Sequence, residues 1–363
     1  MSTATQKVSK EKFSYTSSIA LDVWKPKTDS KAFEWWYFDA LSEDGRDAVV
    51  IIFLDNFIFS PRYNASNRKN QNGTSSHKRF PAIAFCYYRD GKPVYRAVNE
   101  YDSKEFSAGQ DSPSCSIENS SFNYQSAPYG SGYFVAINAK LSKNRHIEAH
   151  FEWLSIESDF LPDKKINKDD AHIWNLVVSR SDVTGRITVS NEKGVNLDVI
   201  HFRGTGYHDH NSDNRWLPET VCDWQWGRAH FFDSTAVFYR YQEVNENPIN
   251  KLFTIRDGIL KESDAVYEET NFKRDKFGLK YATRQTVLTE DDVRLRIKNQ
   301  QIIDSSFFYL RFLSEMTLTL RDGKPRKTLG ITEYLAPKSL KYRWLDWLVN
   351  MRIGRDGKGS FLP

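Results

Sequence analysis

Two neighbouring segments, Phe33-Glu-Trp-Trp-Tyr-Phe-Asp-Ala40 and Ala48-Val-Val-Ile-Ile-Phe-Leu54, decide the fold class of this chain. The first is rich in aromatic residues and the second in β-branched residues, and both types favour strands. Between them lies Glu43-Asp-Gly45, and an acidic residue followed by glycine is typical of a hairpin turn. The two segments therefore predict a β-hairpin.

Short apolar runs of the same kind recur along the chain and are separated by Gly, Asn and Asp. They lie at residues 82–88, 134–138, 146–153, 172–178, 235–239 and 307–312. Such runs predict sheets or barrels rather than helices, so the fold class is all-β. Aromatic residues make up 14% of the chain, which suits large apolar interiors. Residues 60–79 are polar and predict a long loop.

The length of 363 residues predicts two domains. Residues 1–30 show no strand pattern and predict a loose N-terminal arm. Residues 212–222 interrupt the later strand pattern, so a boundary is placed there. The expected division is an N-terminal β domain of residues 31–215 and a C-terminal β domain of residues 216–363.

The segment from Leu340 to Met351 differs from the rest, because its apolar residues follow helical spacing. It predicts a short C-terminal helix, flanked by basic residues that include Lys338, Lys341 and Arg343. The favoured interpretation is a closing helix packed on the barrel. The alternative is an interfacial anchor on an anionic membrane.

Charge and composition exclude several classes of function. The net charge is only +4, and no basic stripe or arginine-rich arm is present, so we expect no nucleic-acid partner. No GxGxxG or P-loop motif occurs, and no cofactor is expected. The three cysteines form no CxxC pair, no secretory signal is evident, and no run approaches about 18 apolar residues. We expect a cytoplasmic protein, with peripheral contact at the inner membrane surface.

The stretch Gly204-Thr-Gly-Tyr-His-Asp-His-Asn211 concentrates the chemically useful side chains. In a strand, alternate side chains share a face. One face then carries a phenol, a carboxyl and an amide, from Tyr207, Asp209 and Asn211. The other face carries the imidazoles of His208 and His210. His172 and Trp174 lie upstream with the same spacing, and could meet Asp209 if these faces look into one cavity.

Two histidines at alternate positions also invite a metal-site interpretation. His208 and His210 could bind one ion with His201 or His230 as a third ligand. His-x-His pairs often occur by chance, however, and acid catalysis is the better hypothesis. No metal site is predicted.

These residues resemble the carotenoid 1,2-hydratase (hydroxyneurosporene synthase) family. The resemblance runs from Glu34-Trp-Trp-Tyr-Phe-Asp-Ala40 through Phe59-Ser-Pro-Arg-Tyr63, Gly204-x-Gly-Tyr-x-Asp-x-Asn211 and Asp223-Trp-Gln-Trp-Gly-Arg-Ala229 to the C-terminal segment. The wider lipocalin-like superfamily includes kievitone hydratase and fungal decalin-forming Diels–Alderases. Membership implies two lipocalin-like β domains, each a barrel or a sandwich, with a ligand cavity near their junction.

The resemblance also implies an acid mechanism, in which an Asp is assisted by a His, a Trp and a Tyr. These roles fall on Asp209, His172, Trp174 and Tyr207. Expected substrate-binding residues are Trp224, Trp226, Asn211 and Trp36. The sequence departs from the family at His208 and His210, which are more polar than expected, and after Asn211, where Ser-Asp-Asn-Arg stands in place of Trp-Gly. These departures bear on the substrate more than on the fold.

The expected function is that of a cofactor-independent hydro-lyase acting on an apolar isoprenoid, with a carotenoid as the leading substrate. Asp209 would protonate an isolated double bond, Trp174 and Tyr207 would stabilise the cation, and water would give a tertiary alcohol. His172 would bond Asp209 or position the water. Two alternatives stay open, namely a cyclase or isomerase of natural-product biosynthesis and a lipocalin-like carrier without chemistry. The exact substrate, the stereochemistry, capture by water or by an internal nucleophile, and the oligomeric state stay undetermined.

Overall fold

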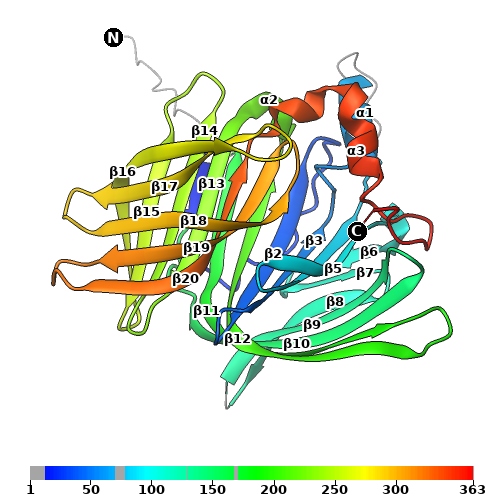
Figure 1. The fold of residues 1–363 in the computed structure, drawn as a ribbon, viewed down its shortest axis with the longest axis horizontal. Helices are drawn as coiled ribbons and strands as arrows, with labels where there is room; N and C mark the ends of the chain where they lie inside the picture. The colour runs from blue at the N-terminus through cyan, green and yellow to red at the C-terminus, as the bar shows by residue number, and fades with distance from the viewer. Residues whose placement is uncertain (1–12, 70–77, 129, 167–170, 363) are drawn as a thin grey trace, which may run out of the picture.

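The computed structural model describes residues 13–69, 78–128, 130–166 and 171–362. Strands make up most of these residues (Figure 1). They form one large open sheet and one closed barrel. In Figure 1 the barrel strands are mostly yellow and orange, and the sheet runs from blue to green. The predicted all-β fold is confirmed.

The open sheet is built from the N-terminal strands of the chain. They are β1 (Phe13–Thr16), β2 (Phe33–Ser42), β3 (Asp47–Leu54), β4 (Ala82–Arg89), β5 (Lys92–Glu100), β6 (Phe106–Ala108), β7 (Ser114–Ile117), β8 (Ser120–Ala127), β9 (Gly130–Leu141), β10 (Arg145–Ser158), β11 (His172–Ser190) and β12 (Asn196–Asp213). Their order is β5-β4-β3-β2-β12-β11-β10-β9-β8-β7-β6, and β1 runs parallel to β11. The predicted β2–β3 hairpin is present.

The barrel is built from the C-terminal strands, each antiparallel to its neighbours. They are β13 (Val221–His230), β14 (Thr235–Glu243), β15 (Ile249–Arg256), β16 (Ile259–Arg274), β17 (Lys280–Thr289), β18 (Arg294–Ser305), β19 (Tyr309–Thr319) and β20 (Pro325–Leu335). The link from β12 to β13 contains the single turn α2 (Leu217–Thr220). We propose residues 31–215 and 216–363 as the two domains, since residue 215 lies in this link.

Two segments expected to lack regular structure are ordered. Residues 13–30 are not an arm, because β1 pairs with β11 and Asp22 is fully buried; residues 1–12 lie outside the described residues. The expected loop over 60–79 begins as helix α1 (Pro61–Lys69). Pro61 suits the first helical position, where its missing N–H costs nothing. The Ser60 hydroxyl accepts the Arg62 N–H at 3.1 Å, so the helix start is stabilised.

The C-terminal segment is only partly helical. It consists of the 3-10 turns η3 (Pro337–Lys341) and η4 (Arg343–Leu345) and of the short helix α3 (Asp346–Asn350). Leu340 and Leu345 are buried, and Arg68 of α1 pairs with Asp346. The predicted short helix is confirmed, while the continuous helical spacing of 340–351 is broken into three pieces. In Figure 1, α1, α2 and α3 gather at one end of the molecule.

The two faces of β2 and β12 look into different interiors. Even-numbered residues of β2, such as Trp36 and Phe38, join the core inside the sheet. Odd-numbered residues, such as Tyr37, join a second core that the sheet shares with the barrel. Because β2 and β12 pair with Asp209 opposite Tyr37, the odd-numbered residues of β12 also face the barrel.

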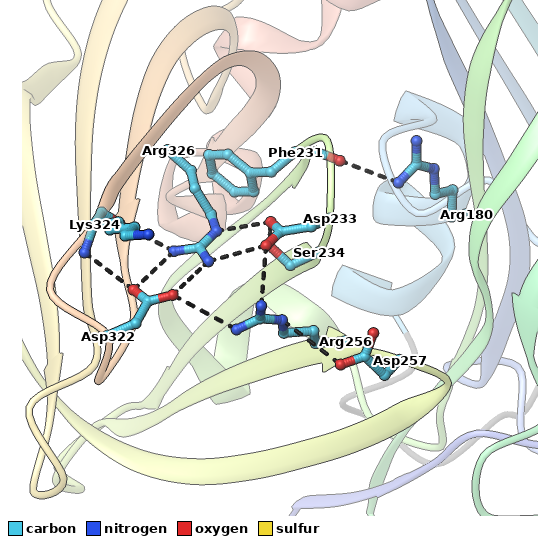
Figure 2. A network of polar contacts seen from close by, with 9 residues as sticks. All are labelled: Arg180, Phe231, Asp233, Ser234, Arg256, Asp257, Asp322, Lys324 and Arg326. Carbon is cyan, nitrogen blue, oxygen red and sulfur yellow. Dashed lines mark hydrogen bonds and ion pairs between the residues drawn. The ribbon is translucent and has the colours of Figure 1, made fainter.

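At the end of the barrel far from α1, α2 and α3, charged side chains connect the turns between strands (Figure 2). Arg326 donates to Asp233 at 2.7 Å and to Asp322 at 2.7 Å. Arg256 lies 3.4 Å from the same Asp233. Arg180 of β11 donates to the Phe231 carbonyl at 3.1 Å and so ties the sheet to this end. These contacts hold the turns together, and all of them lie away from the cavity described below.

A buried ion pair joins the barrel to the sheet, between the end that carries the helices and the end with the charged turns. Arg228 of β13 donates through Nε to Asp39 of β2 at 2.8 Å, and both side chains are almost completely buried. A charge at such a depth is tolerated only while its partner is present. The pair therefore fixes how the barrel sits on the sheet.

We predict that Arg228→Met lowers the free energy of unfolding by about 3–5 kcal/mol, because it leaves Asp39 buried without its partner. Arg203→Met, which breaks the exposed 3.0 Å pair with Glu43, is the control and leaves the urea midpoint unchanged. Adding Asp39→Leu to Arg228→Met restores much of the loss. Equal midpoints for the two single variants would contradict this role.

Candidate active site

A cavity of about 250 Å³ lies at the junction of the sheet and the barrel. Its wall is mainly aromatic and aliphatic. Both the sheet and the barrel contribute side chains to it, including Trp35, Ile52, Phe59, Trp224, Phe308 and Leu335. A few polar groups interrupt this lining. Asp209 and Asn211 of β12 are two of them. An apolar cavity with few convergent polar groups is the usual form of a small-molecule site.

The Asp209 carboxyl is held by three neutral donors. Its Oδ2 accepts from Trp174 Nε1 at 3.0 Å and from Tyr207 Oη at 2.8 Å. Asn211 Nδ2 lies 2.9 Å from Oδ1. Among the described residues, none of these hydrogen-bond partners carries a charge. Two donors already engage Oδ2, so Oδ1 is the oxygen better placed to carry a proton.

Burial raises the pKa of Asp209 from 3.8 to about 8, because an ionised carboxylate is poorly solvated there. The hydrogen bonds from Trp174 and Tyr207 act in the opposite direction and lower the pKa. The effect of burial dominates, since neutral donors replace only part of the lost hydration. The carboxyl is therefore protonated at neutral pH and can serve as an acid.

Trp174 and Tyr207 lie behind Asp209 and are not part of the cavity wall. Tyr207 Oη also accepts from Trp226 Nε1 at 3.2 Å, so a chain of donors runs from the barrel to the carboxyl. Trp174 stacks on Tyr239 with ring centroids 4.5 Å apart. Their position suits them to orient Asp209, whereas a cation in the cavity would meet other rings.

His172 does not contact Asp209 in the structure. Its Nε2 lies 2.8 Å from Tyr239 Oη, and its Nδ1 lies 3.6 Å from Asp213 Oδ2. Burial lowers the pKa of His172, which favours the neutral ring. Because Tyr239 stacks on Trp174, His172 reaches Asp209 only through two intervening side chains.

His208 and His210 face the interior of the sheet and pair with acids there. His208 Nε2 lies 2.9 Å from Asp22, and His210 lies 3.2 Å from Asp22 and 2.9 Å from Glu34. Burial opposes the shift, yet hydrogen bonds to both acids raise the pKa of His210 to about 9. Within the described ranges, no group of three or more His, Cys, Asp or Glu is arranged to hold a metal ion.

The expected substrate-binding residues fall into two groups. Trp224, Trp226 and Asn211 line the cavity. Trp36 does not, because it lies on the sheet side of β2 and stacks on His210 with centroids 4.6 Å apart. Its neighbour Trp35 lines the cavity instead. Alternation separates Trp35 from Trp36, but it cannot tell which face meets the cavity without the β2–β12 register.

A second polar group in the cavity wall is absent from the residues that the sequence analysis selects. It consists of Tyr37, Arg311 and Glu333. Tyr37 Oη donates to Glu333 Oε1 at 2.9 Å, and Arg311 Nε donates to the same oxygen at 2.7 Å. Tyr37 and Glu333 lie nearly 300 positions apart in the sequence. The alternate spacing of Tyr309 and Arg311 places both on one face of a strand and is the one sequence signal for polar groups at this position.

The sequence model of a family described as carotenoid hydratase CrtC matches residues 154–361. Hydroxyneurosporene dehydrogenase of Chlorobaculum tepidum is 25% identical over 358 residues, which cover 95% of this chain and 93% of that protein. Acyclic carotenoid 1,2-hydratase of Thiocapsa roseopersicina is 23% identical over 216 residues, which cover 56% of this chain and 46% of that protein.

Solved structures share the fold. An AttH structure from Nitrosomonas europaea has a TM-score of 0.56 at 14% identity, covering 84% of this chain and 92% of that one. CghA with Sch210972 has a TM-score of 0.54 at 13% identity, covering 85% and 89%. At such identities the likeness concerns the fold alone.

We predict that Asp209→Asn stabilises the protein increasingly as pH rises from about 4 to about 8. In this window the unfolded wild-type chain releases the Asp209 proton while the folded protein keeps it, so wild-type stability falls. The variant has no proton to lose. Urea unfolding of both proteins across this window measures the difference.

The control is Asp257→Asn, which removes an exposed turn carboxyl with 86% of its side chain exposed. It should show no such growth of the difference with pH. A stability difference for Asp209→Asn that stays constant between these pH values would contradict a raised pKa.

Proposed function

The chain belongs to the carotenoid hydratase CrtC family, and we propose that it adds water to an isolated double bond of an acyclic carotenoid. The observation that carries the proposal is Asp209, a carboxyl on an apolar cavity whose pKa burial raises to about 8. Family membership supports hydration of a carotenoid as the class of reaction. The name of the Thiocapsa roseopersicina relative agrees with it.

The first step is transfer of the Asp209 proton to the alkene. The π electrons form the new C–H bond at the less substituted carbon, and the Asp209 O–H bond breaks. A tertiary cation and a carboxylate result. Trp174 and Tyr207 donate to Oδ2 and would strengthen these bonds as negative charge develops there.

The cation is stabilised by the aromatic wall of the cavity. Trp35, Trp224 and Trp226 line the site, and each indole face offers an attraction of about 0.5–2 kcal/mol to a cation. The π electrons of the indole faces stabilise the cation until water attacks. The oxygen of that water forms the C–O bond of a tertiary alcohol, the proton that it loses passes by way of a base to solvent, and solvent returns a proton to the Asp209 carboxylate. Alkene and water account for all atoms of the product.

His172 contributes at a distance. Its contacts to Tyr239 and Asp213 hold Tyr239 against Trp174. Trp174 in turn donates to Asp209. We therefore assign His172 a positioning role, through the orientation of the acid.

Incubation of the purified protein with acyclic carotenoids in ¹⁸O-labelled water tests the proposal directly. A tertiary alcohol that carries one ¹⁸O atom supports hydration. An isomer of unchanged mass would instead support a cyclase or isomerase that uses the same cavity. Tight binding of every carotenoid tried, without conversion, would support a carrier.

We predict that Asp209→Asn lowers the hydration rate by about 10²–10⁴-fold, the usual contribution of a general acid. Since the reaction needs the protonated acid, wild-type turnover should fall as pH rises through about 8. Product formation measured by mass spectrometry against pH provides both values. Turnover that persists in the variant, or that increases above this pH, would exclude Asp209 as the proton donor.

We further propose that the cavity mouth docks on an anionic membrane surface. Trp344 and Trp347 are 70% and 57% exposed, and the exposed basic residues beside them are Lys338, Lys341 and Arg343. The neighbouring Leu348, Val349 and Leu362 belong to the cavity lining. Exposed tryptophans with basic neighbours suit the interface of a bilayer that holds the substrate. Among the described residues, no helix is long and apolar enough to cross a membrane.

We predict that the double variant Trp344→Ala/Trp347→Ala binds phosphatidylglycerol vesicles at least about tenfold more weakly, because two anchoring rings are lost. Turnover of a detergent-dispersed carotenoid should stay at the wild-type level. Phe232→Ala is the control, since this fully exposed ring lies just past the far end of β13. Co-sedimentation measures binding, and an equal effect of both changes would contradict the docking surface.

A further inference from the structure

We propose that Glu333 is the general base of the hydration, so that two different carboxyl groups give and take the protons. The inference rests on the proposed function, in which Asp209 is the acid. Asp209 alone could in principle serve as both donor and acceptor. Four features of the cavity favour a division of the two roles.

The first feature is position. Glu333 of β20 and Asp209 of β12 line the same cavity. Tyr37 lies opposite Asp209 in the pairing of β2 with β12, and its hydroxyl donates to Glu333 Oε1 at 2.9 Å. Trp226, which donates to Tyr207, lies opposite Glu333 in the pairing of β13 with β20. Tyr37 and Trp226 therefore each connect the surroundings of one carboxyl group with those of the other.

The second feature is charge. Asp209 has only neutral hydrogen-bond partners among the described residues, whereas Arg311 donates to Glu333 at 2.7 Å. A guanidinium next to a carboxyl supports its ionised form, and an apolar site without a cation supports the neutral form. Two carboxyl groups in such contrasting surroundings are suited to opposite tasks in proton transfer.

The two sites are also electrostatically linked. Burial is the main cause of the raised pKa of Asp209, and the negative charge of Glu333 raises it further. An ionised Glu333 thus helps Asp209 to keep its proton before the reaction. The ionised form of Glu333, which can accept a proton, thus favours the protonated form of Asp209, which can donate one.

The third feature is exposure. The Arg311 side chain is 4% exposed and the Glu333 side chain is 19% exposed, so Glu333 is the partner more open to the cavity. Packing does not require this pair, because replacing a buried ion pair with apolar side chains is often neutral or stabilising. A second charged set also lines the cavity, namely Arg96, Asp304 and Arg352. What distinguishes Glu333 is its hydrogen bond from Tyr37, which lies opposite Asp209 in the pairing of β2 with β12.

The fourth feature is a donor suited to a water molecule. Tyr309 lines the cavity, and its buried hydroxyl makes no hydrogen bond within the described part of the chain. Tyr309 and Arg311 are alternate residues of β19, and Arg311 lies opposite Glu333 in the pairing of β19 with the adjacent strand β20. A water near both groups could donate to Glu333 and accept from Tyr309, and its free lone pair would attack the cation.

The proton balance then closes through two carboxyl groups. Asp209 loses its proton to the alkene carbon and becomes a carboxylate. The water forms the C–O bond while one of its O–H bonds breaks, and that proton moves to Glu333. Exchange with solvent returns Glu333 to the carboxylate and Asp209 to the acid, so no other reactant is consumed.

The test is Glu333→Gln in deuterated water, with deuterium measured separately in the alcohol and in the recovered alkene. Glutamine keeps an oxygen that can accept from Tyr37 but cannot take a proton. Capture of the cation should slow, and alcohol formation should fall by about 10²–10⁴-fold. The Asp209 carboxylate then removes a proton from the waiting cation, so the ratio of labelled alkene to alcohol rises above the wild-type ratio.

Two further variants complete the design. Glu333→Asp keeps a carboxylate and should restore a ratio near that of the wild type, which also covers the case in which Glu333→Gln folds poorly. Glu268→Gln, an exposed position of β16 outside the cavity lining, should leave rate and ratio unchanged.

The outcomes distinguish a failure of the Glu333 assignment from a failure of the proposed hydration. An unchanged ratio in Glu333→Gln, at whatever rate, would mean that the residue acts only in structure, and it overturns the assignment. A wild-type protein that forms no alcohol refutes the hydration itself. A raised ratio in Glu333→Gln, with rescue by Glu333→Asp, supports the base.

Discussion

Strand β12 belongs to two interiors at once, and this constraint organises the charges of the molecule. Its even-numbered residues His208 and His210 enter the sheet core, where they contact the carboxyl groups of Asp22 and Glu34. Its odd-numbered residue Asp209 enters the junction core, where it meets only neutral donors. Burying a charge is expensive unless it is paired, so the hydrogen bonds from Asp22 and Glu34 raise the pKa of His210, while Asp209 keeps its proton. A one-residue shift of β12 would exchange the two sets.

An acid of this kind costs stability, and the surrounding structure has to offset that cost. Keeping Asp209 away from a counter-charge sacrifices stability at neutral pH, as is common at functional sites. The offset comes from elements that do no chemistry. Arg228 and Asp39 fix the barrel against the sheet, and the ion pairs around Asp233 and Arg326 hold the far turns together. The cavity end can thus be open and apolar because the remainder of the molecule is tightly connected.

The local sequence pattern predicts those structural features that depend on neighbouring residues. It does not predict the contacts that depend on residues distant in the sequence. The β2–β3 hairpin and the separation of Asp209 from His210 follow from turn chemistry and from the two-residue period of a strand. The period does not reveal which face meets the cavity, and this is why Trp36 rather than Trp35 is among the expected substrate-binding residues. The partners of His172, which are Tyr239 and Asp213, depend on how the barrel rests on β11. The sequence predicts a loop where helix α1 forms, because the polar composition of this segment resembles that of a loop, while its burial depends on tertiary packing.

The size and polarity of the cavity together suggest how one water can react inside an apolar site. At about 250 Å³ the cavity is slightly below the usual size for drug-like ligands, so under the proposed function it would hold an end of a long polyene rather than the whole chain. The remainder must leave through the mouth, where Leu362 and Phe277 are partly exposed. A bound chain end then closes the mouth against bulk solvent. Under the proposed mechanism the attacking water has to be held in advance, and Glu333, Arg311 and Tyr309 form one polar part of the wall at which it would be retained.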